Sequence, residues 1–118
     1  MKLQTAGWLV ALAVAAGSAH AQDVGLANDV QQGHRLAVAV CSLCHDAAPD
    51  QEIEPILRPP APSFRSIAQR DNVNADSLRL FLTRTHKDIG TATGMPNPQL
   101  MDFQIREVIA YLLSLRKR

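Results

Sequence analysis

The chain of 118 residues is short of aromatic side chains, with one Trp, one Tyr and three Phe. It also has only two cysteines, which excludes a zinc site built from four thiolates. Hydrophobic residues still make up 47% of the chain, which excludes disorder and favours one compact domain. A core with so few aromatic rings gains from enclosing a large apolar group, because burial of apolar area drives folding.

The N-terminal segment is typical of a secretory signal peptide. Lys2 supplies a short positive start, 6–16 is an unbroken run of apolar or small residues, and Ala-His-Ala at the end fits a small-x-small cleavage site. The apolar run is shorter than the roughly 20 residues that span a bilayer, which disfavours a transmembrane helix. We therefore predict removal of 1–21 by cleavage after Ala21, a periplasmic location, and one domain over 22–118 that does not insert stably into a membrane.

Charges of the two signs nearly cancel, with 12 Lys and Arg against 11 Asp and Glu. Loss of Lys2 with the signal peptide would leave 12 − 1 = 11 basic residues against 11 acidic ones. Nucleic acids and anionic membrane surfaces attract proteins with a basic excess, so we expect neither as a partner. The basic C-terminus, 116–118, is the local exception, and we expect it to act as a solubilising tail at the negative end of the last helix.

Helical spacing of apolar residues recurs along the predicted domain, whereas strand-like alternation does not. The predicted helices cover 29–45, about 64–70, the residues that follow the N-cap Asn74, and 102–115 with Asp102 as N-cap. The last helix has the most regular pattern, with Ile105, Val108, Ile109, Leu112 and Leu115 on one face. The apolar run 36–40 is also compatible with a buried strand. We expect an all-α fold.

Two long loops separate these helices. Five prolines lie between residues 46 and 63, and Gly90, Gly94, Pro96 and Pro98 lie between residues 87 and 100. Proline lacks the backbone N–H and is excluded from helix interiors and central strands. Long ordered loops in a small domain need something to pack against.

The residues that carry chemistry are Cys41-Ser42-Leu43-Cys44-His45. Two thiols at this spacing reach the two vinyl groups on one edge of a porphyrin, and the histidine that follows can bind the iron. The motif therefore predicts one haem c, attached through Cys41 and Cys44 and ligated by His45.

Three other interpretations of the cysteine pair are weaker. A zinc site lacks further cysteines, and the other histidines of the domain, His34 and His86, are scattered. A thioredoxin-like pair requires a βαβ framework, but here a helical stripe precedes the motif. A disulfide between residues so close in sequence would close too small a loop to stabilise much.

A second iron ligand is expected from the loop before the last helix. Met95 lies between Gly94, which lets the backbone approach the ring, and Pro96, which stiffens it. Methionine together with histidine raises the reduction potential. His86, Met101 or an open site are the alternatives to Met95.

On these residues the chain resembles the class I bacterial cytochromes c over 31–115. The resemblance implies that the first and last helices cross, with Gly33 at the crossing and Tyr111 in the last helix, and that the loops wrap the covalent haem. Ala37 stands where the family often has an aromatic residue. The resemblance also implies that the carbonyl of Pro62 accepts a hydrogen bond from His45 Nδ1.

The function expected from this resemblance is one-electron transfer without catalysis, so we expect no catalytic residues. The expected partners are an electron donor such as a dehydrogenase and an acceptor such as a terminal oxidase. The alternatives are a dedicated haem subunit of one periplasmic dehydrogenase, and a haem protein whose open distal site binds a small ligand. For the haem propionates, Arg58, Arg65, Arg79 and Arg84 are the available cations.

Overall fold

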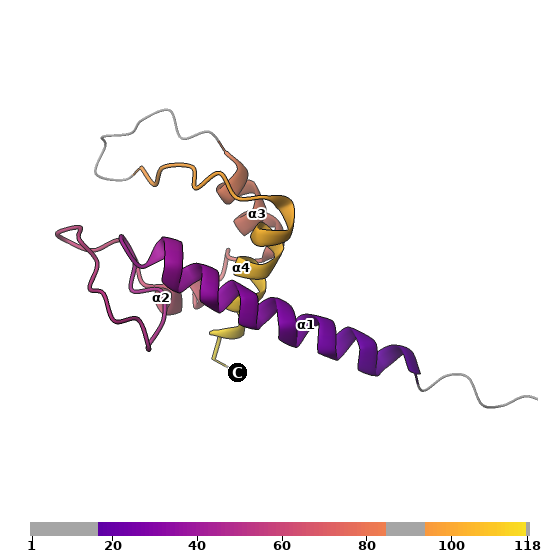
Figure 1. The fold of residues 1–118 in the computed structure, drawn as a ribbon. Coiled ribbons are helices and arrows are strands. Elements are labelled where there is room, and N and C mark those ends of the chain that lie inside the picture. The colour runs from indigo at the N-terminus through magenta and orange to yellow at the C-terminus, as the bar shows by residue number, and fades with distance from the viewer. Residues whose placement is uncertain (1–16, 85–93, 118) are drawn as a thin grey trace, which may run out of the picture.

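The computed structural model describes residues 17–84 and 94–117, with side chains described from residue 22 onward. Their regular elements are the helices α1 (Gly17–Leu36), α2 (Phe64–Ala68), α3 (Ala75–Thr83) and α4 (Asp102–Ser114), and the short π-helical turn η1 (Ala37–Cys41) (Figure 1). No strand is present in these ranges, so the all-α prediction is confirmed. None of the helices described is both long and apolar enough to cross a membrane.

The crossing of α1 and α4 is the main helix contact of the fold (Figure 1). Gly33 lies at this crossing, where an added Cβ would stand 1.9 Å from the Glu107 carbonyl oxygen and 2.8 Å from Tyr111 Cβ. Only glycine permits such an approach of two backbones. Ala37 is fully buried beside the crossing.

The first helix starts at Gly17 rather than near residue 29, so that boundary was predicted wrongly. Residues 22–28 are all exposed, and this half of α1 projects from the body of the protein (Figure 1). A stretch of helix that does not pack against the rest of the protein needs no regular spacing of apolar residues. The sequence pattern therefore does not indicate where such a stretch begins. Most of the predicted signal peptide lies outside the described residues.

The same helix also ends earlier than predicted, in the π-helical turn η1. The amide of Ser42 donates to the carbonyl of Ala37 at 3.1 Å, five residues back instead of four. The wider turn carries Val40 out of the buried stripe, so that this side chain is 43% exposed. The alternative of a strand over 36–40 is wrong.

Side-chain caps begin the later helices. Asn74 caps α3 as predicted, since its Oδ1 accepts from Ser77 N–H and Ser77 Oγ accepts from Asn74 N–H, both at 2.9 Å. The N-cap of α4 is Met101 rather than Asp102, because Gln104 Oε1 accepts from the Met101 N–H at 3.0 Å. This position leaves Met101 57% exposed.

The core lies where α4 meets α1, α2 and α3. Four of the predicted apolar positions of α4 are buried: Ile105, Val108, Ile109 and Leu112. Leu78 of α3 is buried against them, whereas Phe81 of the same helix is 45% exposed. The apolar spacing of the last helix therefore located its core side correctly.

The C-terminus does more than solubilise the chain. Arg116 Nε donates to the Ala68 carbonyl at 2.9 Å, and Arg116 Nη2 donates to the Val73 carbonyl at 2.6 Å. Gln69 Nε2 donates to the Leu115 carbonyl at 3.1 Å beside them. These bonds fasten the end of α4 to α2 and to the turn before α3.

Replacing Arg116 with Ala is expected to lower the free energy of unfolding by about 1–3 kcal/mol, because hydrogen bonds to a charged group typically contribute that much. Denaturant unfolding of the holo-protein measures the change. Lys117→Ala removes a neighbouring charge whose side chain bonds to none of the described residues, and it should change stability by less than about 0.5 kcal/mol. Equal losses in the two variants would show that charge, and not the hydrogen bonds of Arg116, is responsible.

Candidate functional site

The predicted motif occupies the end of η1 and the tight turn that follows it. The carbonyl of Cys41 accepts hydrogen bonds from Cys44 N–H at 3.1 Å and from His45 N–H at 2.9 Å. Both thiols are free, so no disulfide joins them. The turn holds Cys41, Cys44 and His45 close together on one short stretch of backbone.

Ser42, between the two cysteines, closes this turn. Its side chain is buried, and its Oγ donates to the Val38 carbonyl at 2.6 Å. The π-helical register directs the Ser42 amide to Ala37 instead of Val38. The hydroxyl therefore provides the hydrogen bond that the Val38 carbonyl would otherwise lose. Nothing in the spacing of the sequence indicated this role.

The imidazole of His45 is buried and oriented. Its Nδ1 lies 2.7 Å from the Pro62 carbonyl oxygen, and a carbonyl can only accept, so Nδ1 carries the proton. The neutral ring then has its lone pair on Nε2, which has no hydrogen-bond partner among the described residues. A nitrogen of this kind, on a side chain only 8% exposed, fits a metal ligand whose other nitrogen is held by the protein.

Pro62 reaches His45 because its segment runs parallel to the motif. Ala61 N–H donates to the Cys44 carbonyl at 3.0 Å, and Phe64 N–H donates to the Asp46 carbonyl at 2.9 Å. The Phe64 ring also meets the His45 ring edge-on, with 5.5 Å between centroids. The hydrogen bond that the resemblance implied for Pro62 is thus present in the structure.

The two thiols differ in their surroundings. Burial, together with the nearby Cys44, raises the pKa of the Cys41 thiol to about 11. A thiol with this pKa stays protonated at neutral pH and is a poor participant in disulfide exchange. The disulfide alternative is therefore disfavoured on chemical grounds as well as by geometry.

Met95 lies in the segment 94–101 that leads into α4, and it is partly buried. Of the alternatives, Met101 is 57% exposed at the start of α4. His86 lies outside the described residues. No cluster of three His, Cys, Asp or Glu side chains occurs in the part of the chain that the structure describes, so the zinc alternative has no ligand set there.

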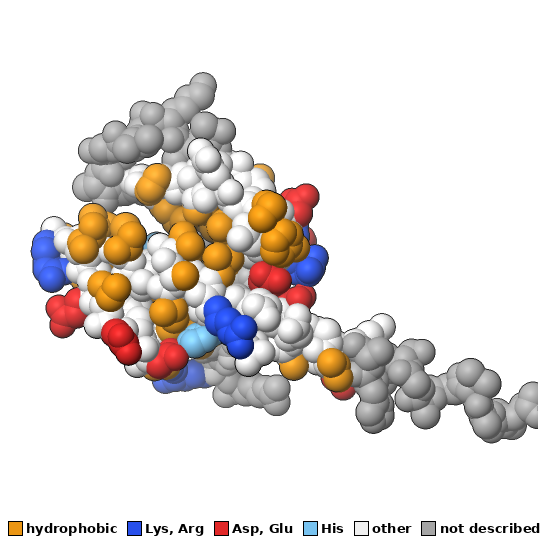
Figure 2. Space-filling view, in the orientation of Figure 1, with side chains coloured by type: hydrophobic (Ala, Val, Ile, Leu, Met, Phe, Trp, Pro, Cys, Tyr) orange, Lys and Arg blue, Asp and Glu red, His pale blue; other side chains and the backbone are white. Residues whose placement is uncertain are grey.

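Several large apolar side chains near the motif are exposed, among them Val40, Leu43 and Leu57. Figure 2 shows hydrophobic side chains gathered between the 94–101 segment and the loop that follows the motif. Exposed apolar side chains that lie together on the surface of a small protein are typical of a binding site. The thiols, the free Nε2 and this surface together fit a haem.

Two arginines among those considered for the propionates have other partners. Arg58 lies 3.9 Å from Glu54 and donates to the carbonyls of Pro55 and Leu57. Arg79 lies 3.7 Å from Asp102. Arg65 and Arg84 are exposed and form no ion pair with the other described residues.

Tyr111 joins α4 to the loop after the motif. Its hydroxyl donates to the Ala47 carbonyl at 3.1 Å, and burial raises the pKa of this phenol. Its ring meets that of His34 at 5.1 Å and that of Phe64 at 6.4 Å. The aromatic residue implied in the last helix therefore supports the same loop that carries His45.

An ion pair on the surface ties the loop to α1 as well. His34 Nε2 lies 2.7 Å from Asp50 Oδ1, and this hydrogen bond holds the pKa of Asp50 below its ordinary value. A carboxyl whose pKa is lowered on folding stabilises the folded state above its ordinary pKa, and this contribution is lost as the pH falls through the lowered value.

The stability advantage of the wild type over Asp50→Asn is therefore expected to be full near pH 5 and to shrink as the pH falls below about 4. Thermal unfolding of both holo-proteins between pH 3 and pH 6 measures it. Asp71→Asn removes another exposed carboxylate that has no ion pair, and it serves as the control. A difference for Asp50→Asn that persists unchanged at pH 3 would contradict the assignment.

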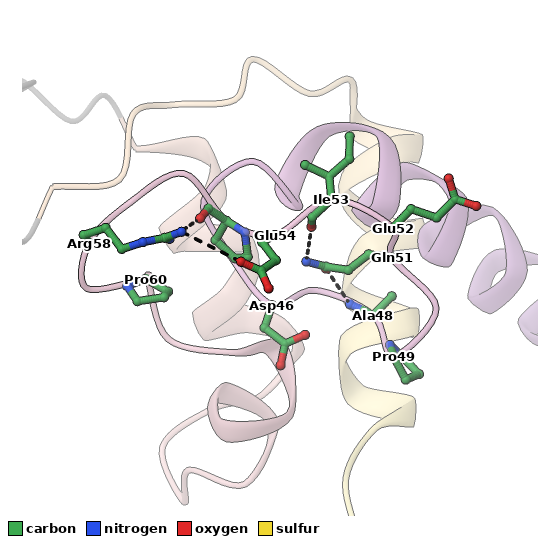
Figure 3. A pocket seen from close by; sticks show the side chains of 10 residues that line it. Asp46, Ala48, Pro49, Gln51, Glu52, Ile53, Glu54, Arg58 and Pro60 are labelled. Carbon is green, nitrogen blue, oxygen red and sulfur yellow. Dashed lines mark hydrogen bonds and ion pairs between the residues drawn. The ribbon is translucent and has the colours of Figure 1, made fainter.

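An open hollow of about 770 Å³ lies within the loop after the motif, apart from the predicted ligands (Figure 3). Its lining consists of Asp46, Ala48, Pro49, Gln51, Glu52, Ile53, Glu54, Pro55, Arg58 and Pro60. Gln51 bridges the loop here, since its Oε1 accepts from Ala47 N–H at 2.7 Å and its Nε2 donates to the Ile53 carbonyl at 2.9 Å. The sequence distinguished Gln51 in no way from other polar loop residues.

Comparison with known proteins agrees with this geometry. A sequence model of the family described as Cytochrome c matches residues 30–116. The chain is 33% identical to cytochrome c-552 of Bradyrhizobium diazoefficiens over 116 residues, which cover 98% of this chain and 99% of that protein. No solved structure matches significantly.

Proposed function

Because this chain belongs to the cytochrome c family and so carries electrons on a covalently bound haem c, we propose that it does so in the periplasm with His45 and Met95 as iron ligands. The observation that supports the ligand set best is the buried imidazole of His45. Its Nδ1 is engaged by the Pro62 carbonyl at 2.7 Å, while Nε2 has no partner among the described residues.

When bound, the haem supplies an iron that alternates between the ferrous and ferric states. Cys41 and Cys44 would hold it through thioether bonds, and His45 Nε2 would ligate the iron. Pro62 fixes the orientation of the imidazole and strengthens its donation to the metal. Met95 would supply the second iron ligand, and with two protein ligands the iron would offer no vacant site to a substrate. It is therefore a carrier and not an enzyme.

The periplasmic location rests on the predicted signal peptide. Cleavage after Ala21 leaves the contact of α1 with α4 intact, because that contact begins with Asp29, whose carboxylate accepts from Arg106 Nε at 3.0 Å, and includes Gly33. Of the helix, cleavage would remove only residues 17–21. We expect the carrier to receive electrons from a protein such as a dehydrogenase and to pass them to one such as a terminal oxidase.

Replacing Met95 with Ala in the holo-protein is expected to abolish the weak sulfur-to-iron charge-transfer band of the ferric form. The reduction potential should fall, since the thioether favours ferrous iron. The variant should also gain rapid binding of cyanide or carbon monoxide at the vacated position. Absorption spectroscopy and potentiometry of protein produced in a host able to attach haem measure these changes.

Met101→Ala is the matched control, because Met101 is a methionine of the same segment and lies exposed at the start of α4. It should keep the band and the potential of the wild type. A band that survives in Met95→Ala and disappears in Met101→Ala would transfer the ligand role to Met101. A high-spin ferric spectrum in the wild type would instead indicate an open distal site.

A further inference from the structure

The backbone of residues 46–48, which follow His45, is held by hydrogen bonds to other parts of the protein. Asp46 O accepts from Phe64 N–H at 2.9 Å, and Ala47 O accepts from the Tyr111 hydroxyl at 3.1 Å. Ala47 and Ala48 are almost completely buried, with 1% and 4% exposed. Their amides therefore cannot be satisfied by water and need partners within the protein.

Gln51 provides those partners. Its Oε1 accepts from Ala47 N–H at 2.7 Å and from Ala48 N–H at 3.2 Å. Its Nε2 donates to the Ile53 carbonyl at 2.9 Å (Figure 3). The same Nε2 also donates to the His45 carbonyl at 3.4 Å. The Gln51 side chain thus connects the backbone of residues 45–48 to the backbone of Ile53, further along the same loop.

We propose that Gln51 is a positioning residue for the haem iron: it acts through the backbone of residues 45–48 to keep the His45 imidazole in its hydrogen bond with Pro62. This inference rests on the proposed function, because it requires His45 to ligate the iron. The physical reason is that a histidine ring is only as well oriented as the main chain that bears it. Without Gln51, two buried amides lose their acceptor and the segment must rearrange to find others.

The test compares Gln51→Met with Gln69→Met in the holo-protein. Gln69 is a fair control because its side chain also bonds backbone groups, the Leu115 carbonyl at 3.1 Å and the Lys117 amide at 3.3 Å, far along the chain from the motif. Methionine has a similar length and cannot reproduce either set of bonds. Both variants should unfold at a lower temperature than the wild type.

Only Gln51→Met is expected to change the iron site. The His45 proton resonances of the ferric protein should move, and the reduction potential should rise, because a less firmly held Nδ1–H leaves the imidazole a weaker donor. Amide exchange at Ala47 and Ala48 should accelerate in this variant and not in Gln69→Met. Unchanged His45 resonances and potential in Gln51→Met, or equal changes in both variants, would overturn the proposal.

Gln51→Glu is the second test variant, to be used if Gln51→Met does not fold and incorporate haem. Its carboxylate can still accept from the Ala47 and Ala48 amides, but it cannot donate to the carbonyls of His45 and Ile53. We expect slow amide exchange to be retained while the His45 resonances move, and wild-type resonances would overturn the proposal. A wild-type protein without iron-bound histidine signals would refute the proposed function itself, which separates the two failures.

Discussion

Replacement of both Cys41 and Cys44 by serine is expected to reduce covalently bound haem to background. A hydroxyl does not form the thioether bond, and these are the two cysteines of the chain, so nothing else can replace them. The measurement is the haem spectrum of the polypeptide after denaturation and extraction with acidified solvent. The wild type should retain its haem under this treatment, and the double variant should release all of it.

The control is Asp71→Ser, which changes an exposed residue outside the motif and leaves both thiols in place. It should bind haem as the wild type does. Each single cysteine variant should hold haem through one remaining bond. Haem that stays with the double-serine chain after extraction would exclude attachment through this motif.

Replacement of Gly33 with Ala should destabilise the fold more than any other exchange of similar size. The added Cβ would lie 1.9 Å from the Glu107 carbonyl oxygen, so the two helices would have to separate. Overpacking of this severity costs about 3 kcal/mol or more, against a total stability of roughly 5–15 kcal/mol for a typical domain. Denaturant unfolding of the holo-protein, together with the yield of folded protein, measures the loss.

Gly25 offers the matched control within the same helix. Nothing lies within 4 Å of a Cβ built there, so Gly25→Ala adds no clash. Alanine is the better helix former by about 1 kcal/mol, and the exchange should be neutral or slightly stabilising. If Gly33→Ala were as harmless as Gly25→Ala, the crossing of α1 and α4 would not be as close as the structure places it.

Sequence patterns predicted the parts of the structure that follow local rules. The cap at Asn74 and the apolar face of α4 were confirmed, because capping and burial leave a regular trace in the sequence. The hydrogen bond from His45 to Pro62 spans 17 residues and was implied only by resemblance to a family. Spacing alone does not identify which of several loop prolines comes to lie beside the histidine.

The features that sequence patterns did not predict depend on contacts between distant residues or on irregular backbone. Arg116 was expected to be a solvated charge, yet it binds the carbonyls of Ala68 and Val73, which lie more than forty residues away. The bonds of Gln51 occur within one irregular loop, for which no periodicity exists. The start of α1 was missed because helical residues that touch nothing show no pattern of burial.

The π-helical turn makes the chain intolerant of changes in length at one place. Between Gly33 at the helix crossing and Cys41 at the attachment site, the chain passes through a turn in which Ser42 N–H reaches back to Ala37. Removing one residue from this segment would rotate the haem-attachment motif by about 100° relative to the crossing of α1 and α4. Natural relatives should therefore show insertions and deletions in the proline-rich loop after the motif, but none in the segment from the glycine to the first cysteine.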